Sequence, residues 1–195
     1  MRKGIALFCT VFMLLSSGYA QSNRVGVYAT PQYVFFKTGT LFEEEREKGK
    51  GFAFNGGVYY GKQWDVVGFS VGLGYSQLNT TISGVTHKTG FVSVPINGHY
   101  DYDITDNFFI GTQVTAAFCV PISEKQVVDG VETSLDAAKK LHLQYGLGLS
   151  FTYLFSDNLG ISVLPTFSLL ATDRDMIFLC WGAGAQIRIF YAFGY

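Results

Sequence analysis

Side chains that could perform catalysis are few in this sequence. Ser83, His87 and Asp173 are of the kinds that supply a nucleophile, a base and an orienting carboxylate, and all three fall in polar segments. The same residue types are common in ordinary loops, and no zinc-ligand spacing, phosphate loop or Gly-x-Ser-x-Gly elbow accompanies them. We therefore expect no catalytic residue, no metal ligand and no cofactor.

A second group of polar side chains alternates with apolar residues in otherwise apolar segments. Arg188 is the most demanding member, because a buried guanidinium needs partners, and Asp101 and Gln32 fall on the same face as candidates. We expect a hydrogen-bonded structural cluster, and a charge that tunes an open lumen is the alternative. The members of the predicted cluster are Arg188, Asp101, His99, Gln32, Asn97 and Gln144.

Eight segments show period-two alternation of apolar and polar residues, which predicts β-strands. In the third segment, for example, Val67, Val71 and Leu73 alternate with glycine and serine. The composition agrees, because 15% charged residues, 16% aromatic residues and 23 glycines are typical of a strand-rich protein with apolar surfaces. The predicted strands cover residues 24–37, 52–61, 65–79, 89–102, 108–122, 141–155, 159–171 and 177–195.

The apolar faces of these strands are predicted to point outward, toward lipid. Charged residues concentrate in the connections, so the polar faces are too small and too uncharged to coat a soluble barrel. Inside a narrow barrel the same side chains would fill the lumen, and closure would pair every backbone group in hydrocarbon. We predict an all-β fold, an eight-stranded antiparallel up-and-down transmembrane β-barrel closed by pairing the last strand with the first. A soluble, lipocalin-like ligand-binding barrel is an alternative.

The first 20 residues have the pattern of a secretory signal peptide. Arg2 and Lys3 precede an apolar run at 5–15, and small residues at 16–20 suggest cleavage after Ala20. The apolar run is shorter than the roughly 20 residues that a spanning helix needs. We therefore divide the chain into a signal peptide, 1–20, and a barrel domain, 21–195.

Two cysteines, Cys119 and Cys180, follow the predicted signal peptide. An exported protein could join them in a disulfide. They fall on strands that are not predicted to be neighbours, so we expect two buried thiols and keep the disulfide as the alternative.

Connection lengths predict the orientation of the barrel. The connections 38–51, 80–88, 123–139 and 172–176 are longer or more polar than the others, as external loops are, and both chain ends then lie on the periplasmic side. Proline inside a strand usually marks an edge or a bulge, so bulges are predicted at Pro31, Pro95 and Pro165. An aromatic girdle is predicted near the periplasmic side, from Tyr100, Tyr102, Tyr153, Phe155, Tyr191, Phe193 and Tyr195.

Three segments carry a resemblance to a known family. Val92-Ser93-Val94-Pro95-Ile96, Gly72-Leu73-Gly74-Tyr75 and the terminal aromatic strand resemble the small outer-membrane β-barrel domains common in the Bacteroidetes, and more loosely the porin-like barrels of OmpA and OmpX type. The resemblance implies delivery by periplasmic chaperones and insertion by the outer-membrane assembly machinery, which reads such strands. Tyr191, Phe193 and Tyr195 would then be an insertion signal as well as part of the girdle.

The expected protein is a monomeric, non-enzymatic, integral outer-membrane barrel in contact with outer-membrane lipid. Its role is expected to be structural or, through a surface ligand on loops 38–51 and 123–139, recognition at the cell surface. An outer-membrane barrel enzyme acting on lipid or peptide at the external rim, where Ser83, His87 and Asp173 would meet, is the alternative. A net charge of −1 without a basic patch argues against nucleic acid.

Overall fold

The computed structural model of the chain describes residues 22–37, 48–82, 84–135, 141–171 and 179–194. No helix among these residues is long and apolar enough to cross a membrane. The described residues form strands β1 (Ser22–Lys37), β2 (Lys48–Trp64), β3 (Val67–Ile82), β4 (Val85–Thr105), β5 (Phe108–Val128), β6 (Val131–Leu135), β7 (His142–Leu154), β8 (Leu159–Ala171) and β9 (Leu179–Phe193).

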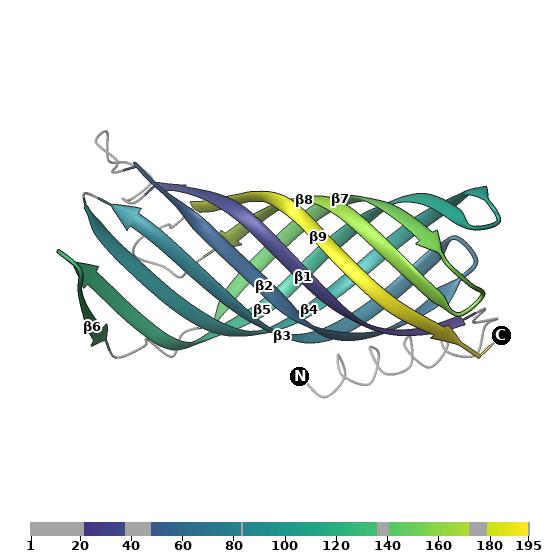
Figure 1. The fold of residues 1–195 in the computed structure, drawn as a ribbon, viewed down its shortest axis with the longest axis horizontal. Coiled ribbons are helices and arrows are strands. Elements are labelled where there is room, and N and C mark those ends of the chain that lie inside the picture. The colour runs from purple at the N-terminus through teal and green to yellow at the C-terminus, as the bar shows by residue number, and fades with distance from the viewer. Residues whose placement is uncertain (1–21, 38–47, 83, 136–140, 172–178, 195) are drawn as a thin grey trace, which may run out of the picture.

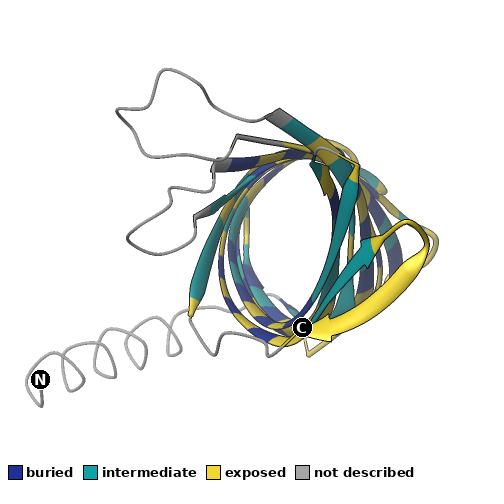
Figure 2. Cartoon of the chain, turned by 90° about the vertical axis from the view of Figure 1, so that its left-hand side faces the viewer, coloured by how far each residue is buried: buried dark blue, intermediate teal, exposed yellow. Residues whose placement is uncertain are grey.

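Eight of the strands close into a barrel, as predicted (Figure 1). Each pairs antiparallel with its neighbour in the order β1, β2, β3, β4, β5, β7, β8 and β9, and β9 returns to β1 with Val25 opposite Tyr191. Figure 2 shows the ring from the end at which β6 lies, opposite to the end at which β9 finishes. Because every barrel strand has two partners, no backbone edge is left along the ring.

Alternation of side-chain size and polarity explains which face points outward. On β3, Leu73 is 56% exposed on the outer face, whereas Ser70 on the opposite face is 1% exposed. Gly68 and Gly72 are buried beside it, so the lumen side of this strand is lined by residues that need little space. On this strand, the apolar outer face and the inner face of small residues agree with the predicted faces.

Two predicted loops are largely strand. In the predicted loop 80–88, β3 continues to Ile82 and β4 begins at Val85. In the predicted loop 123–139, β5 continues to Val128. After a turn, the chain forms the short strand β6, which pairs with β5 and is not part of the closed ring. Asp129 and Gly130 have φ values of 50° and 80°, the pair of left-handed residues that a tight hairpin turn requires. The polar and charged residues of these segments predicted loops, but a strand is defined by backbone pairing with its neighbours, which does not require an apolar outer face.

The prediction of bulges at Pro31, Pro95 and Pro165 is wrong. Each proline is paired with a residue of one neighbouring strand. Toward the other neighbouring strand, the pairing is interrupted at the proline and resumes in the same register. Proline has no N–H to donate, so a ladder hydrogen bond is lost while the spacing along the strand is kept.

A bulge occurs instead in β5 beside a fourth proline. Phe91 pairs with Pro121 and Gly90 pairs with Ser123, which leaves Ile122 as the extra residue. An extra residue shifts the alternation by one. On β5, Lys125 therefore lies on the outer face beside Lys88 of β4, whereas Glu124 pairs with Thr89 on the inner face.

Candidate functional site

A charged cluster lies in the lumen at the end of the barrel where β1 begins and β9 ends. Arg24 Nη1 is 3.5 Å from Asp101 Oδ2, and Ser150 Oγ donates a hydrogen bond of 3.1 Å to Asp101 Oδ1. His99 Nε2 is 4.0 Å from the same carboxylate and 2.6 Å from Gln63 Oε1. The cluster joins β1, β2, β4 and β7 through the interior of the barrel.

Arg188 does not have the partners predicted for it. Its Nε donates to Gln186 Oε1 at 2.7 Å, and its guanidinium lies over the Tyr59 ring, 5.2 Å from the ring centre. The carboxylate of Asp101 is paired with Arg24, a residue that was not predicted from the sequence. Arg24 and Gln32 both occupy even-numbered positions of β1, which face the lumen. This alternation could have identified Arg24 as a lumen residue.

The middle of the lumen holds a network of amides and hydroxyls. Asn97 Nδ2 donates to Ser70 Oγ at 3.1 Å, and Asn97 Oδ1 accepts bonds from Gln113 Nε2 at 3.2 Å and Thr115 Oγ1 at 2.8 Å. On the other wall, Ser168 Oγ donates to Gln32 Oε1 at 3.1 Å. The predicted residues Asn97 and Gln32 are thus buried and hydrogen-bonded, but in separate parts of the network.

Above this network the lumen is apolar, which was not predicted from the sequence. Two buried clusters fill it, and their members are Val34 and Cys180, and Phe91, Ala117 and Cys119, with Leu78 and Leu170 packed against both. The sequence does indicate this layer, because apolar residues here occupy the inward-facing positions of the strands as well as the outward-facing ones. Gln144, the last member of the predicted cluster, borders this layer and accepts a weak 3.9 Å contact from Cys119 Sγ.

Both thiols are buried and unpaired. Cys119 lies on β5 and Cys180 on β9, and these strands are not neighbours in the ring. The structure therefore agrees with the expectation of two buried thiols rather than a disulfide.

Three small cavities remain between the lumen side chains. Their volumes are about 50 Å³ in the amide network, about 20 Å³ beside the charged cluster and about 40 Å³ in the apolar layer. Small-molecule ligands occupy pockets of roughly 300–1,000 Å³. The described lumen can hold waters or small ions, so the geometry does not favour a lipocalin-like carrier.

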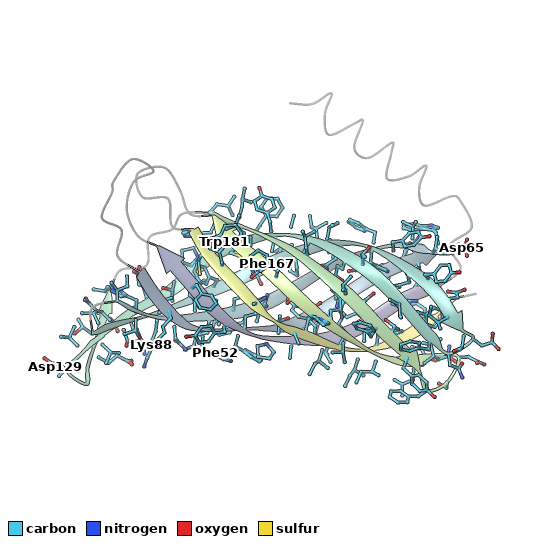
Figure 3. All side chains as sticks on the ribbon, turned by 90° about the horizontal axis from the view of Figure 1, so that it is seen from above. Phe52, Asp65, Lys88, Asp129, Phe167 and Trp181 are labelled. Atoms are coloured by element: carbon cyan, nitrogen blue, oxygen red, sulfur yellow. The ribbon has the colours of Figure 1, made fainter. Side chains whose placement is uncertain are left out.

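The outer surface carries aromatic residues near both ends of the apolar band. The predicted girdle residues, apart from Tyr195, which lies outside the described residues, are exposed near the end of the barrel where β1 begins and β9 ends. A second set lies toward the opposite end of the band, where Phe52, Phe167 and Trp181 are exposed on the outer face (Figure 3). From Trp181 to Tyr191, β9 advances about 25 Å along the axis at a rise of about 3.3 Å per residue and a tilt of about 40°. That length matches the apolar thickness of known transmembrane barrels.

The outer face changes from apolar to polar at a line through Tyr75, Gly90 and Ser123, although the strands continue. We call the part of β3, β4, β5 and β6 above this line the projection; Figure 3 shows Asp129 at its tip and Asp65 at the opposite end of the barrel. Its outer face, with Val127 as the apolar exception, presents Gln77, Asn79, Thr81, Thr86, Lys88, Lys125, Glu132 and Ser134.

One acidic residue joins three strands of the projection. Glu132 on β6 lies 2.6 Å from Lys125 Nζ on β5 and 3.0 Å from Lys88 Nζ on β4. Hydrogen bonds from Lys125 and Lys88 lower the pKa of Glu132 to about 2, and the bond to Glu132 raises the pKa of Lys125. Exposed pairs of this kind contribute little stability each.

The residues of the alternative enzyme hypothesis are not brought together by the described part of the chain. Ser83 and Asp173 lie outside the described residues, and His87 faces Thr80 and Gln126 on the neighbouring strands. The described residues also contain no group of three His, Cys, Asp or Glu side chains that could hold a metal ion.

Comparisons with known proteins identify the fold. No family model and no curated protein matches the sequence. Among solved structures, Neisserial surface protein A is similar with a TM-score of 0.51 and 12% identity, covering 84% of this chain and 96% of that one. Ail of Yersinia pestis has a TM-score of 0.43 and 17% identity, covering 85% and 98%. The translocator domain of NalP from Neisseria meningitidis has a TM-score of 0.39 and 10% identity, covering 98% and 95%. The similarity to Neisserial surface protein A shows that the chain has the fold of an outer-membrane β-barrel.

Proposed function

We propose that this protein is a non-enzymatic, integral outer-membrane barrel that recognises a ligand at the cell surface through its projection. The change of the outer face from apolar to polar at Tyr75, Gly90 and Ser123 carries this proposal. Below that line the surface suits lipid, and above it paired strands expose polar side chains that lipid would not tolerate. A purely structural barrel would need no such extension.

The filled lumen supports recognition over transport. The apolar layer around Val34, Phe91 and Leu170 lies between the projection and the amide network, so ions crossing the barrel would have to pass through a packed apolar region. We expect no steady current when the purified protein is inserted into a planar lipid bilayer.

The proposal includes the route and the location. Export with cleavage of residues 1–20, chaperone delivery and insertion read from Tyr191, Phe193 and Tyr195 would place the chain termini in the periplasm and the projection outside. The family would be that of the small Bacteroidetes-type barrels of OmpA and OmpX type. Outer-membrane lipid would be its permanent partner, with the barrel acting as a monomer.

Cysteine labelling of intact cells tests the location and the orientation. In a Cys119→Ser/Cys180→Ser background, Asn79→Cys in the projection should react with a membrane-impermeant maleimide. Asp106→Cys, at the turn between β4 and β5, should react only after permeabilisation, and Leu73→Cys should be protected by lipid. Labelling of Asp106→Cys but not Asn79→Cys in intact cells would reverse the orientation.

Recognition is tested by shortening the projection. A variant with residues 124–139 replaced by a short Gly/Ser linker keeps the barrel strands, which a heat-modifiability gel checks. Fluorescent wild-type and shortened barrels are applied to arrays of polysaccharides and extracellular proteins. We expect a wild-type signal that the shortened barrel loses; identical patterns would leave only the structural role.

A further inference from the structure

The small cavity beside the charged cluster has an excess of positive charge. Arg24 and Arg188 line this cavity of about 20 Å³, and among the described residues Asp101 is the one acidic residue that lines it. The site therefore stays cationic even when His99, which also lines it, is neutral. A buried excess charge is unfavourable unless a counter-charge is supplied.

The single carboxylate does not neutralise Arg188. Asp101 is already engaged by Arg24 and by the hydroxyl of Ser150. Among the described residues, no carboxylate lies within ion-pair distance of Arg188, and the guanidinium makes one hydrogen bond, to Gln186. Arg188 is 8% exposed, so bulk water does not screen its charge effectively.

Two residues that line the cavity also have hydrogen-bond donors without an acceptor. Arg24 Nε is buried without a hydrogen-bond partner among the described residues. Ser70, which is 1% exposed, accepts a hydrogen bond from Asn97, so its own hydroxyl proton is available to donate. Guanidinium and hydroxyl donors around a cationic cavity are the chemistry of an anion site.

We propose that this cavity binds one small monovalent inorganic anion, chloride under physiological conditions, between the guanidiniums of Arg24 and Arg188. The hydroxyl of Ser70 donates a further hydrogen bond to it. The volume accepts a single ion of this size and excludes organic anions. The anion neutralises Arg188 and completes the plug at the periplasmic end of the lumen, a role separate from recognition by the projection.

Bromide, which replaces chloride and scatters anomalously, tests the site directly. Crystals of the wild-type barrel grown in sodium bromide should show an anomalous peak within hydrogen-bond distance of the Arg24 or Arg188 guanidinium. Unfolding by urea in lipid vesicles provides the second measurement, in sodium chloride and in sodium gluconate at equal concentration. At chloride one hundred times the dissociation constant, the unfolding equilibrium constant should be about 100-fold lower than in gluconate.

Matched variants assign the effect to these residues. Arg188→Gln and, where that variant does not fold, Ser70→Ala should reduce the chloride effect, whereas Lys125→Gln in the projection should keep it. Equal unfolding midpoints in both salts, together with no bromide peak in the wild-type crystal, would show that the cavity holds only water and would overturn the proposal.

Discussion

Arg24 Nη1 lies 3.5 Å from Asp101 Oδ2, and this ion pair joins β1 to β4 across the lumen although β2 and β3 separate the two strands in the sheet. Both side chains are largely buried, with exposed fractions of 17% and 7%. The contact therefore braces opposite parts of the ring at the end of the barrel where β1 begins and β9 ends, in addition to the backbone ladders.

Removal of one partner of this pair should destabilise the barrel. Asp101→Asn leaves Arg24 as an uncompensated buried cation, and we expect a loss of about 3 kcal/mol in the free energy of unfolding. The double variant Arg24→Met/Asp101→Leu should lose less, because no charge is left unpaired. Urea unfolding in vesicles measures both, with Asp103→Asn at the exposed end of β4 as the control. Equal losses in the single and double variants would contradict a buried ion pair.

Substitutions at adjacent residues of β7 should distinguish lipid from lumen. Leu147 is 63% exposed on the outer face, and arginine there should cost about 2–4 kcal/mol near the middle of the bilayer. A methyl group on Gly146 would meet Thr115 Cβ at 3.4 Å, an ordinary contact, so Gly146→Ala should cost less than about 1 kcal/mol. Similar costs for the two variants in vesicle unfolding would mean that the faces are assigned wrongly.

The tip of the projection should be sensitive to acid in a defined range. Because Glu132 has its pKa lowered from 4.5 to about 2 in the folded protein, its contribution is complete above about pH 4.5. That contribution should be lost as the pH falls toward 2, when the carboxylate is protonated and releases Lys125 and Lys88. NMR titration of the Glu132 carboxyl carbon measures the pKa, which should rise in Lys125→Gln. A titration midpoint near 4.5 in the wild type would show that the pairs do not form in solution.

The two thiols should be protected and reduced in the folded barrel. Cys119 and Cys180 should resist maleimide while the protein is folded and should both react after denaturation, with or without a reducing agent. Intact-mass measurement checks the number of labels. A mass lower by two hydrogens, with labelling only after reduction, would demonstrate a disulfide.

The alternation of residue types along the chain was sufficient to determine the fold and the faces of the strands. The period-two alternation predicted that Leu147 faces outward and that Asn97 faces inward. Because the polar face carries few charges, it could not form the water-facing surface of a soluble barrel. The pairing of β1 with β9 followed because the barrel must close. These features depend on local sequence, since each residue's face is set by its neighbours along the strand.

Tertiary structure alone decided which inward residues meet. Alternation assigns a face but not a height along the axis, because height depends on strand tilt, register and bulges such as the one at Ile122. For this reason the sequence predicts Asp101 as a partner of Arg188, whereas its partner in the structure is Arg24. For the same reason the apolar layer around Phe91 was not predicted from the sequence. The projection was not predicted for a related reason: its strands carry polar and charged side chains on their outer face, and only their pairing with neighbouring strands identifies them as strands.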